Sequence, residues 1–201
     1  MAKTENQKTK EIYSNLFKKN KNSYLSLNWG SIESQELRFK ILAEIANLDS
    51  KSILDVGCGL GDFYNWLKRN KYNLDYFGVD ITPEFIRTAE KEYGKDLFIC
   101  EDFISSDFFQ KEGYDYIFSS GIFATYIENP LDTYHKYITK MWNIAKRGVA
   151  FNSLSDWSEN KEKNEYYADP YEIINICRTL TEKIVFKHDY HPRDFTIFLY
   201  K

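Results

Sequence analysis

The sequence predicts a doubly wound α/β fold, in which helices cover both faces of a mostly parallel sheet. Two observations lead to this prediction. From residue 52 onwards, short runs of β-branched and aromatic residues alternate with helical stretches, and such alternation is typical of parallel sheets with helical crossovers. One of the strands also runs into a glycine-rich turn and then a helix, as ligand-binding strands of open α/β sheets do.

Each element of this fold has its own local signal. Five strands are expected at residues 53–56, 76–79, 97–99, 116–118 and 149–151. Two helices are expected to begin at Thr82-Pro83-Glu84 and at Asp169-Pro170, where a capping residue precedes a first-turn proline. Residues 183–190 and 194–200 have the composition of strands and are joined by a short turn at 191–193, which predicts an antiparallel hairpin.

The first fifty residues have the pattern of two helical stretches on either side of a loop near Gly30. We expect residues 1–50 to form a helical cover over a domain of residues 51–201. Because no linker, repeat or low-complexity tract interrupts the chain, we expect one compact domain overall.

The composition argues against several classes of partner. A net charge of -3 provides no long-range field that would recruit nucleic acid. The three cysteines are widely spaced and suit neither a disulfide framework nor a zinc site. The N-terminus lacks an apolar signal core, and no segment has the length and apolar character needed to span a bilayer. We therefore expect a cytoplasmic protein without nucleic-acid or membrane partners.

The most informative motif is the glycine-rich turn that follows the strand at residues 53–56. Its glycines, Gly57, Gly59 and Gly61, allow the backbone to approach a ligand closely. The dinucleotide fingerprint G-x-G-x-x-G would require glycine where this sequence has Asp62. At the end of the next strand, the Asp80 carboxylate can accept hydrogen bonds from both hydroxyls of a ribose. These features predict an adenosine-type ligand.

With these motifs the chain resembles the class I S-adenosylmethionine-dependent methyltransferases over residues 50 to 200. Residues 54–61 resemble the first motif of that family and residues 78–81 its second. Residues 28–31, 34–39 and 188–196 further resemble a group of small bacterial members. The resemblance implies a Rossmann-like sheet of seven strands in the order 3-2-1-4-5-7-6 with an antiparallel last strand. It also implies S-adenosylmethionine as cofactor and S-adenosylhomocysteine as product.

The same resemblance implies roles for particular residues. The turn would surround the methionine part of the cofactor, Asp55 would order its ammonium group, and Asp80 would hold the ribose. Ile81 would pack on the adenine, Asp102 and Phe103 would meet its amino group and ring edge, and Ser120 would close the floor. The expected cofactor-binding residues are Asp55, Gly57, Cys58, Gly59, Gly61, Asp80, Ile81, Asp102, Phe103 and Ser120.

Several other residues admit two interpretations. His188, Tyr190 and His191 are ordinary surface residues of a turn, unless the sixth strand is parallel, which would place them on the ligand side of the sheet. Arg38 or Gln35 either packs in the core or reaches the cofactor carboxylate or the substrate. The remaining candidates are expected to be structural: Trp29, Tyr13, Phe17 and Tyr24 as packing residues, Asp115 in ordering a turn, and His135 on a helix surface.

Methyl transfer from a sulfonium is an in-line displacement that requires positioning more than a catalytic group, so we assign no catalytic residue. The run Ser119-Ser120-Gly121 lacks the Asn/Asp-Pro-Pro-aromatic signature of enzymes that methylate amide or nucleobase nitrogens, and it offers no acidic ligands for Mg²⁺ or Ca²⁺. We expect no metal. The leading hypothesis is methylation of oxygen or nitrogen in a small molecule. The alternatives are a protein or RNA methyltransferase and a non-catalytic cofactor-binding protein.

Overall fold

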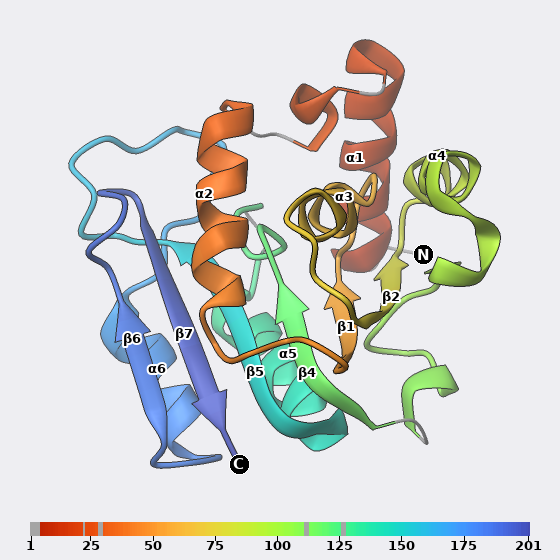
Figure 1. The fold of residues 1–201 in the computed structure, drawn as a ribbon. Helices are drawn as coiled ribbons and strands as arrows, with labels where there is room; N and C mark the ends of the chain where they lie inside the picture. Colours follow the sequence, from red (N-terminus) through yellow and green to blue (C-terminus); the bar gives the residue numbers. More distant parts are fainter. Residues whose placement is uncertain (1–4, 22, 28–29, 111–112, 126–127) are drawn as a thin grey trace.

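The seven strands form one sheet in the order β3-β2-β1-β4-β5-β7-β6 (Figure 1), which confirms the predicted order. The computed structural model describes residues 5–21, 23–27, 30–110, 113–125 and 128–201. The strands are β1 (Ser52–Val56), β2 (Asp75–Asp80), β3 (Phe98–Cys100), β4 (Tyr114–Ser119), β5 (Ala145–Leu154), β6 (Ile184–Lys187) and β7 (Asp194–Tyr200). The helices are α1 (Glu5–Asn20), α2 (Ile32–Ala43), α3 (Asp62–Arg69), α4 (Pro83–Tyr93), α5 (Pro130–Ile144) and α6 (Pro170–Arg178).

The strands β3, β2, β1, β4 and β5 pair in parallel, and β7 is antiparallel to both of its neighbours, β5 and β6. The last strand is therefore antiparallel, as predicted, and β6 runs in the same direction as the first five. Two strand lengths differ from the prediction. β5 extends to ten residues because it pairs with β7 from Gly148 to Leu154, whereas β6 ends at Lys187.

The helix starts follow the predicted positions, with one difference in how they are capped. The Asp169 side chain accepts a hydrogen bond from the backbone N–H of Tyr171 at 2.8 Å, which caps α6. The side chain of Thr82, by contrast, makes no capping bond to α4. The backbone N–H of Thr82 instead donates to Asp80 Oδ1 at 2.7 Å.

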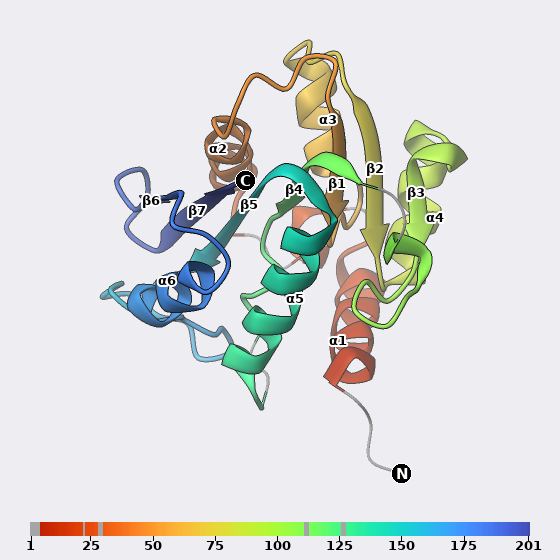
Figure 2. The same ribbon diagram turned by 90° about the horizontal axis from the view of Figure 1, so that it is seen from below.

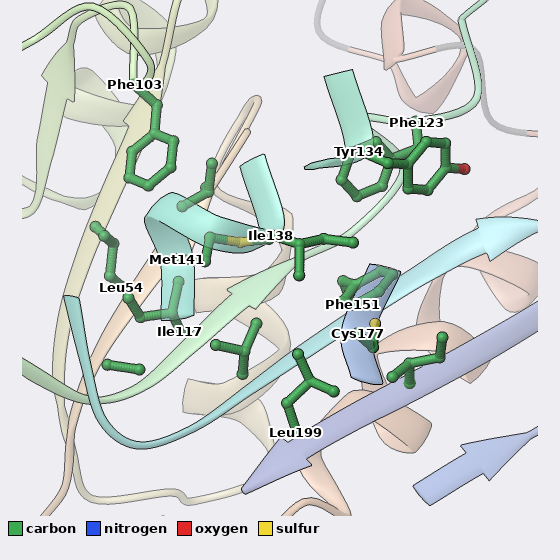
Figure 3. Packing of buried hydrophobic residues seen from close by; sticks show 14 of the residues in the cluster. Leu54, Phe103, Ile117, Phe123, Tyr134, Ile138, Met141, Phe151, Cys177 and Leu199 are labelled. Carbon is green, nitrogen blue, oxygen red and sulfur yellow. The ribbon is translucent and has the colours of Figure 1, made fainter. Parts of the chain in front are cut away.

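Helices cover both faces of the sheet, so that each face has its own hydrophobic core. Figure 2 shows α5 and α6 on the side of the sheet opposite to α2 and α3. Between α5, α6 and the sheet, buried side chains such as Phe123 and Tyr134 stack with ring centroids 4.0 Å apart (Figure 3). On the other face, Phe39 of α2 packs against Phe63 and Trp66 of α3. Aromatic pairs of this kind add stability beyond their burial.

The first helix, α1, lies over the carboxyl ends of the first strands, whereas α2 packs on a face of the sheet beside α3. In Figure 1, α1 lies above the arrowheads of β1 and β2. Tyr13 and Phe17 of α1 pack edge-on against Phe85 of α4, as expected for packing residues. The two predicted packing residues Tyr24, by its side chain, and Trp29 lie outside the described part of the chain. No helix among the described residues is long and apolar enough to cross a membrane.

Candidate functional site

The glycine-rich turn between β1 and α3 uses backbone conformations that favour glycine. Gly57, Gly59 and Gly61 have φ values of 78°, 56° and 82°, a region that other residues rarely adopt. A Cβ on Gly57 would lie 2.1 Å from Ile122 Cγ2. The N–H groups of Gly57 and Cys58 both donate to the carbonyl of Val79, at 2.8 and 3.1 Å. The turn is thereby fixed to the end of β2.

A cavity opens in front of this turn, beneath α1. Most of the residues predicted to bind the cofactor line it, namely Asp55, Gly57, Cys58, Gly59, Asp80, Ile81, Phe103 and Ser120. Gly61 and Asp102 do not line it. The Asp102 Oδ1 atom accepts a hydrogen bond from the Ile104 N–H at 3.0 Å, which orders the loop after β3. Contacts of Gly61 and Asp102 with a ligand remain predictions.

Asp80 lies at the carboxyl end of β2, where its side chain accepts hydrogen bonds from the glycine-rich turn and from the start of α4. Its Oδ2 accepts a hydrogen bond from the Gly59 N–H at 3.0 Å, and its Oδ1 accepts from the Thr82 N–H. Burial raises the pKa of Asp80, although these hydrogen bonds oppose the shift. The Thr82 hydroxyl and the Ile81 backbone also act on this carboxylate as hydrogen-bond donors.

Asp55 is the most deeply buried acid of the cavity wall, with 2% of its surface exposed. Burial raises its pKa from 3.8 to about 7, and the nearby charges of Asp80 and Asp62 act in the same direction. The hydroxyl of Tyr76 donates to Asp55 Oδ2 at 2.7 Å and partly offsets the shift. Asp55 therefore changes its charge near neutral pH.

The cavity suits a ligand that carries positive charge. Four carboxyl groups line it, those of Asp55, Asp62, Asp80 and Glu101. The hydroxyl of Thr82 also lines it, next to the Asp80 carboxylate. S-Adenosylmethionine carries a sulfonium and an ammonium group as well as ribose hydroxyls, so these residues fit it.

Several further residues of this cavity were not predicted from the sequence. Glu101 precedes Asp102 directly, and the alternation of side chains along a strand end makes one of the two face the cavity. Tyr13 and Thr9 of α1 also line it, as does Tyr137, whose ring stacks on Phe103 with centroids 5.9 Å apart. Their patterns are those of ordinary helices. Thr9 and Tyr13 reach the cavity because α1 folds over the sheet, and Tyr137 reaches it from α5.

The floor of the cavity is held by a buried amide on β5. The Asn152 side chain is 2% exposed. Its Nδ2 donates to Ser120 Oγ and its Oδ1 accepts from the Gly121 N–H, both at 3.0 Å. This single side chain fixes the backbone after β4 at the predicted position of the floor. Asn152 carried no signal in the sequence, because its position follows from pairing between strands distant in the chain.

A second cavity adjoins the first and shares Tyr13, Leu27 and Gly121 with it. The second cavity is lined by residues of α2, β5, the loop after β5 and the β6–β7 turn. Its polar lining includes Ser34, Arg38, Asn152, Lys161, Glu165, His191, Arg193 and Asp194. Because β6 runs parallel to the first five strands, the β6–β7 turn lies at their carboxyl ends, the side of the sheet on which the first cavity lies.

The structure distinguishes between the two interpretations given above for Arg38, Gln35 and the residues of the β6–β7 turn. Arg38 is 7% exposed and lies in the second cavity, paired with Asp194, while Gln35 lines the first and donates to Asp62 at 3.0 Å. His191 lines the second cavity, whereas His188 and Tyr190 line neither.

The residues expected to be structural take structural positions. Asp115 accepts hydrogen bonds from the backbone and hydroxyl of Ser52 and pairs with Arg147. It joins β1 to β4 away from both cavities. His135 is exposed on α5.

Comparisons with known proteins agree with this architecture. A family model described as a methyltransferase domain matches residues 47–192. A protein of Mycobacterium tuberculosis that carries the name of a methyltransferase is 33% identical over 162 residues, covering 76% of this chain and 95% of that protein. A carboxy-S-adenosyl-L-methionine synthase of Nautilia profundicola is 32% identical over 69% of this chain, which spans 58% of that relative.

Solved structures share the fold. The magnesium protoporphyrin IX methyltransferase of Synechocystis, crystallised with S-adenosylmethionine, superposes with a TM-score of 0.68 at 14% identity, covering 100% of this chain and 99% of that one. The match of the family model over most of the chain, together with the relative from M. tuberculosis, establishes the family. This chain belongs to the class I methyltransferases, the enzymes that take their methyl group from S-adenosylmethionine.

Proposed function

We propose that this protein transfers the methyl group of S-adenosylmethionine to an oxygen or nitrogen atom of a small molecule. The observation that carries the proposal is the pair of adjoining cavities, which meet at Tyr13, Leu27 and Gly121. A donor in the first cavity and an acceptor in the second would face each other across this junction. Holding two reactants in such an arrangement supplies much of the rate of a displacement reaction.

In this proposal the first cavity holds the cofactor, which supplies an electrophilic methyl group when bound. Asp80, at the carboxyl end of β2 in the wall of this cavity, accepts hydrogen bonds from the ribose hydroxyls. Asp55 faces the ammonium group, and the glycine turn allows the methionine part to lie against its backbone. Ile81 and Phe103 form apolar walls for the adenine.

The shape of the second cavity supports a small acceptor. Its walls come from several separate segments, among them α2 with Ser34 and Arg38 and the loop that contains Lys161 and Glu165. The loop is fastened to the β6–β7 turn because Arg193 Nη2 contacts Glu165 Oε2 and the Tyr167 hydroxyl, both at 2.5 Å. Walls on several sides suit a small molecule better than an extended polymer.

The proposal is tested by following label from methyl-labelled S-adenosylmethionine into a cell extract separated by ultrafiltration into small-molecule and macromolecular fractions. We expect label in a small-molecule product, in amounts that grow with enzyme and time. Label that enters only protein or RNA would favour a macromolecular methyltransferase. Binding of the cofactor without transfer to either fraction would identify a non-catalytic binding protein and contradict the proposal.

A further inference from the structure

Tyr13 of α1 lies where the two cavities meet. It lines both of them, and the other described residues that do so are Leu27, which is apolar, and Gly121, which has no side chain. Among the described residues that line both cavities, Tyr13 is therefore the one with a polar side chain. In the proposed function, the methyl group moves across this junction.

The hydroxyl of Tyr13 lies at a point where the walls of the two cavities are joined. It is 3.0 Å from Oγ1 of Thr125, a residue that lines the first cavity. The backbone of Thr125 forms an antiparallel bridge with Glu165, which lines the second cavity. Beside this bridge, the backbone N–H of Tyr166 donates to the carbonyl of Ala124 at 2.9 Å. Two segments, one from each cavity, are thus paired next to the residue that the Tyr13 hydroxyl contacts.

The charges around the hydroxyl agree with this position. Burial raises the pKa of Tyr13 above its ordinary value, the hydrogen bond with Thr125 opposes the shift, and the carboxylates of Asp80 and Glu165 add to it. Asp80 belongs to the first cavity and Glu165 to the second, so the hydroxyl lies within electrostatic range of both. With a raised pKa the hydroxyl stays protonated at neutral pH, and it acts as a hydrogen-bonding group rather than as a base.

Contacts between α1 and α4 hold the Tyr13 side chain in place. Its ring packs edge-on against Phe85 of α4, with centroids 6.0 Å apart. The next residue of α1, Ser14, donates from its hydroxyl to Glu84 Oε2 at 3.1 Å. A side chain that is already held loses less conformational freedom when a ligand binds to it. The Tyr13 hydroxyl is therefore preorganised for a ligand at the junction.

The hydroxyl of Tyr13 can bind a further group. Within the described part of the chain its hydrogen-bond partner is Thr125, and a hydroxyl has one proton to donate and two lone pairs to accept with. Whichever of the two hydroxyls donates, the Tyr13 oxygen keeps a lone pair. We propose that the Tyr13 hydroxyl binds the nucleophilic oxygen or nitrogen group of the acceptor and holds it at the junction. This inference rests on the proposed function and adds a residue to its acceptor site.

This hydrogen bond contributes to the rate through the position of the acceptor. The acceptor's lone pair forms the new bond to the methyl carbon, while the bond between that carbon and sulfur breaks and leaves its electron pair on sulfur. The proton that the acceptor loses passes to water. Reacting atoms have to be held about 3–3.5 Å apart and in line, and a misplacement of about 1 Å costs roughly a hundredfold in rate. Tyr13 therefore matters for transfer even though it takes no proton.

The variant Tyr13→Phe tests this role, because it keeps the ring against Phe85 and removes only the hydroxyl. With saturating methyl-labelled S-adenosylmethionine and the small-molecule filtrate of a cell extract, we expect transfer of label to slow about ten- to a hundredfold. The affinity for S-adenosylmethionine, measured by calorimetry, should match that of the wild type. Ser14→Ala is the matched control, because it removes the neighbouring hydroxyl of α1, which lines neither cavity; it should keep the wild-type rate.

The variant Thr125→Val separates binding of the acceptor from support of α1. It removes the hydrogen-bond partner of Tyr13 and leaves the Tyr13 hydroxyl in place, so its transfer rate should fall much less than that of Tyr13→Phe. Equal losses in the two variants, or transfer at the wild-type rate by Tyr13→Phe, would overturn the inference and leave small-molecule methylation standing. Absence of transfer to the filtrate by the wild type would instead overturn the proposed function, and this inference with it.

Discussion

Replacing Asp80 with alanine should weaken S-adenosylmethionine binding by roughly ten- to a hundredfold. The proposed ribose hydroxyls would lose their acceptors in a partly buried site, which costs about 1–3 kcal/mol. The apo protein should lose some stability as well, because the Gly59 and Thr82 N–H groups lose their partner. The loss is limited, since removing Asp80 also removes a carboxylate whose raised pKa marks an unfavourable burial.

Calorimetric titration and thermal melting of one preparation separate the two effects. Asp75→Ala is the matched control, because this carboxylate lies on the same strand at the opposite, exposed end; its affinity should equal that of the wild type. Asp80→Ala with unchanged affinity and a lowered melting temperature would show that Asp80 only supports the turn, and the ribose contact would have to be abandoned.

The stability of the cofactor-free protein should decrease as pH rises from about 4 to about 7 through the ionisation of Asp55. Its pKa is raised to about 7 in the folded protein from the ordinary value of 3.8, so the folded state holds a proton that the unfolded state has released. The contribution of Asp55 to the free energy of unfolding is complete below pH 4 and is lost as pH rises through 7. At 1.36 kcal/mol per pKa unit, the loss is at most about 4 kcal/mol.

Urea unfolding of the wild type and of Asp55→Asn across this pH range measures the contribution. The variant cannot ionise, so its unfolding free energy should exceed that of the wild type above pH 7, with the gap closing towards pH 4. Acids with lowered pKa values, such as Asp115, affect the unfolding free energy of both proteins equally. Their effect therefore cancels in the difference between the wild type and the variant. A gap that does not vary with pH would contradict the buried-acid description of Asp55.

Much of the fold could be predicted from local patterns. β7 was predicted at its observed bounds, 194–200, because its apolar residues fill a buried strand. The extent of β5 could not be predicted in the same way, since its first and last residues are strand residues only through pairing with β4 and β7. The predicted capping role of Thr82 was wrong, since its side chain makes no capping hydrogen bond to α4.

The cofactor side of the site was predictable because its residues follow one another in short motifs. The glycine turn and Asp80 each lie at a strand end, where the parallel sheet brings them together. The second cavity depends instead on contacts between distant segments, such as Arg38 with Asp194 and Arg193 with Glu165. Sequence spacing carries no information about such pairs, so His191 could not be preferred over His188 before the structure placed it.

The central claim, a cofactor site for S-adenosylmethionine at the glycine turn, is tested most directly by isothermal titration calorimetry of the whole protein. The ligands are S-adenosylmethionine and, in parallel, nicotinamide adenine dinucleotide. We expect saturable binding of S-adenosylmethionine to one site per chain. We expect no measurable binding of the dinucleotide, because Asp62 occupies the position of the third fingerprint glycine. Equal or tighter binding of the dinucleotide would contradict it.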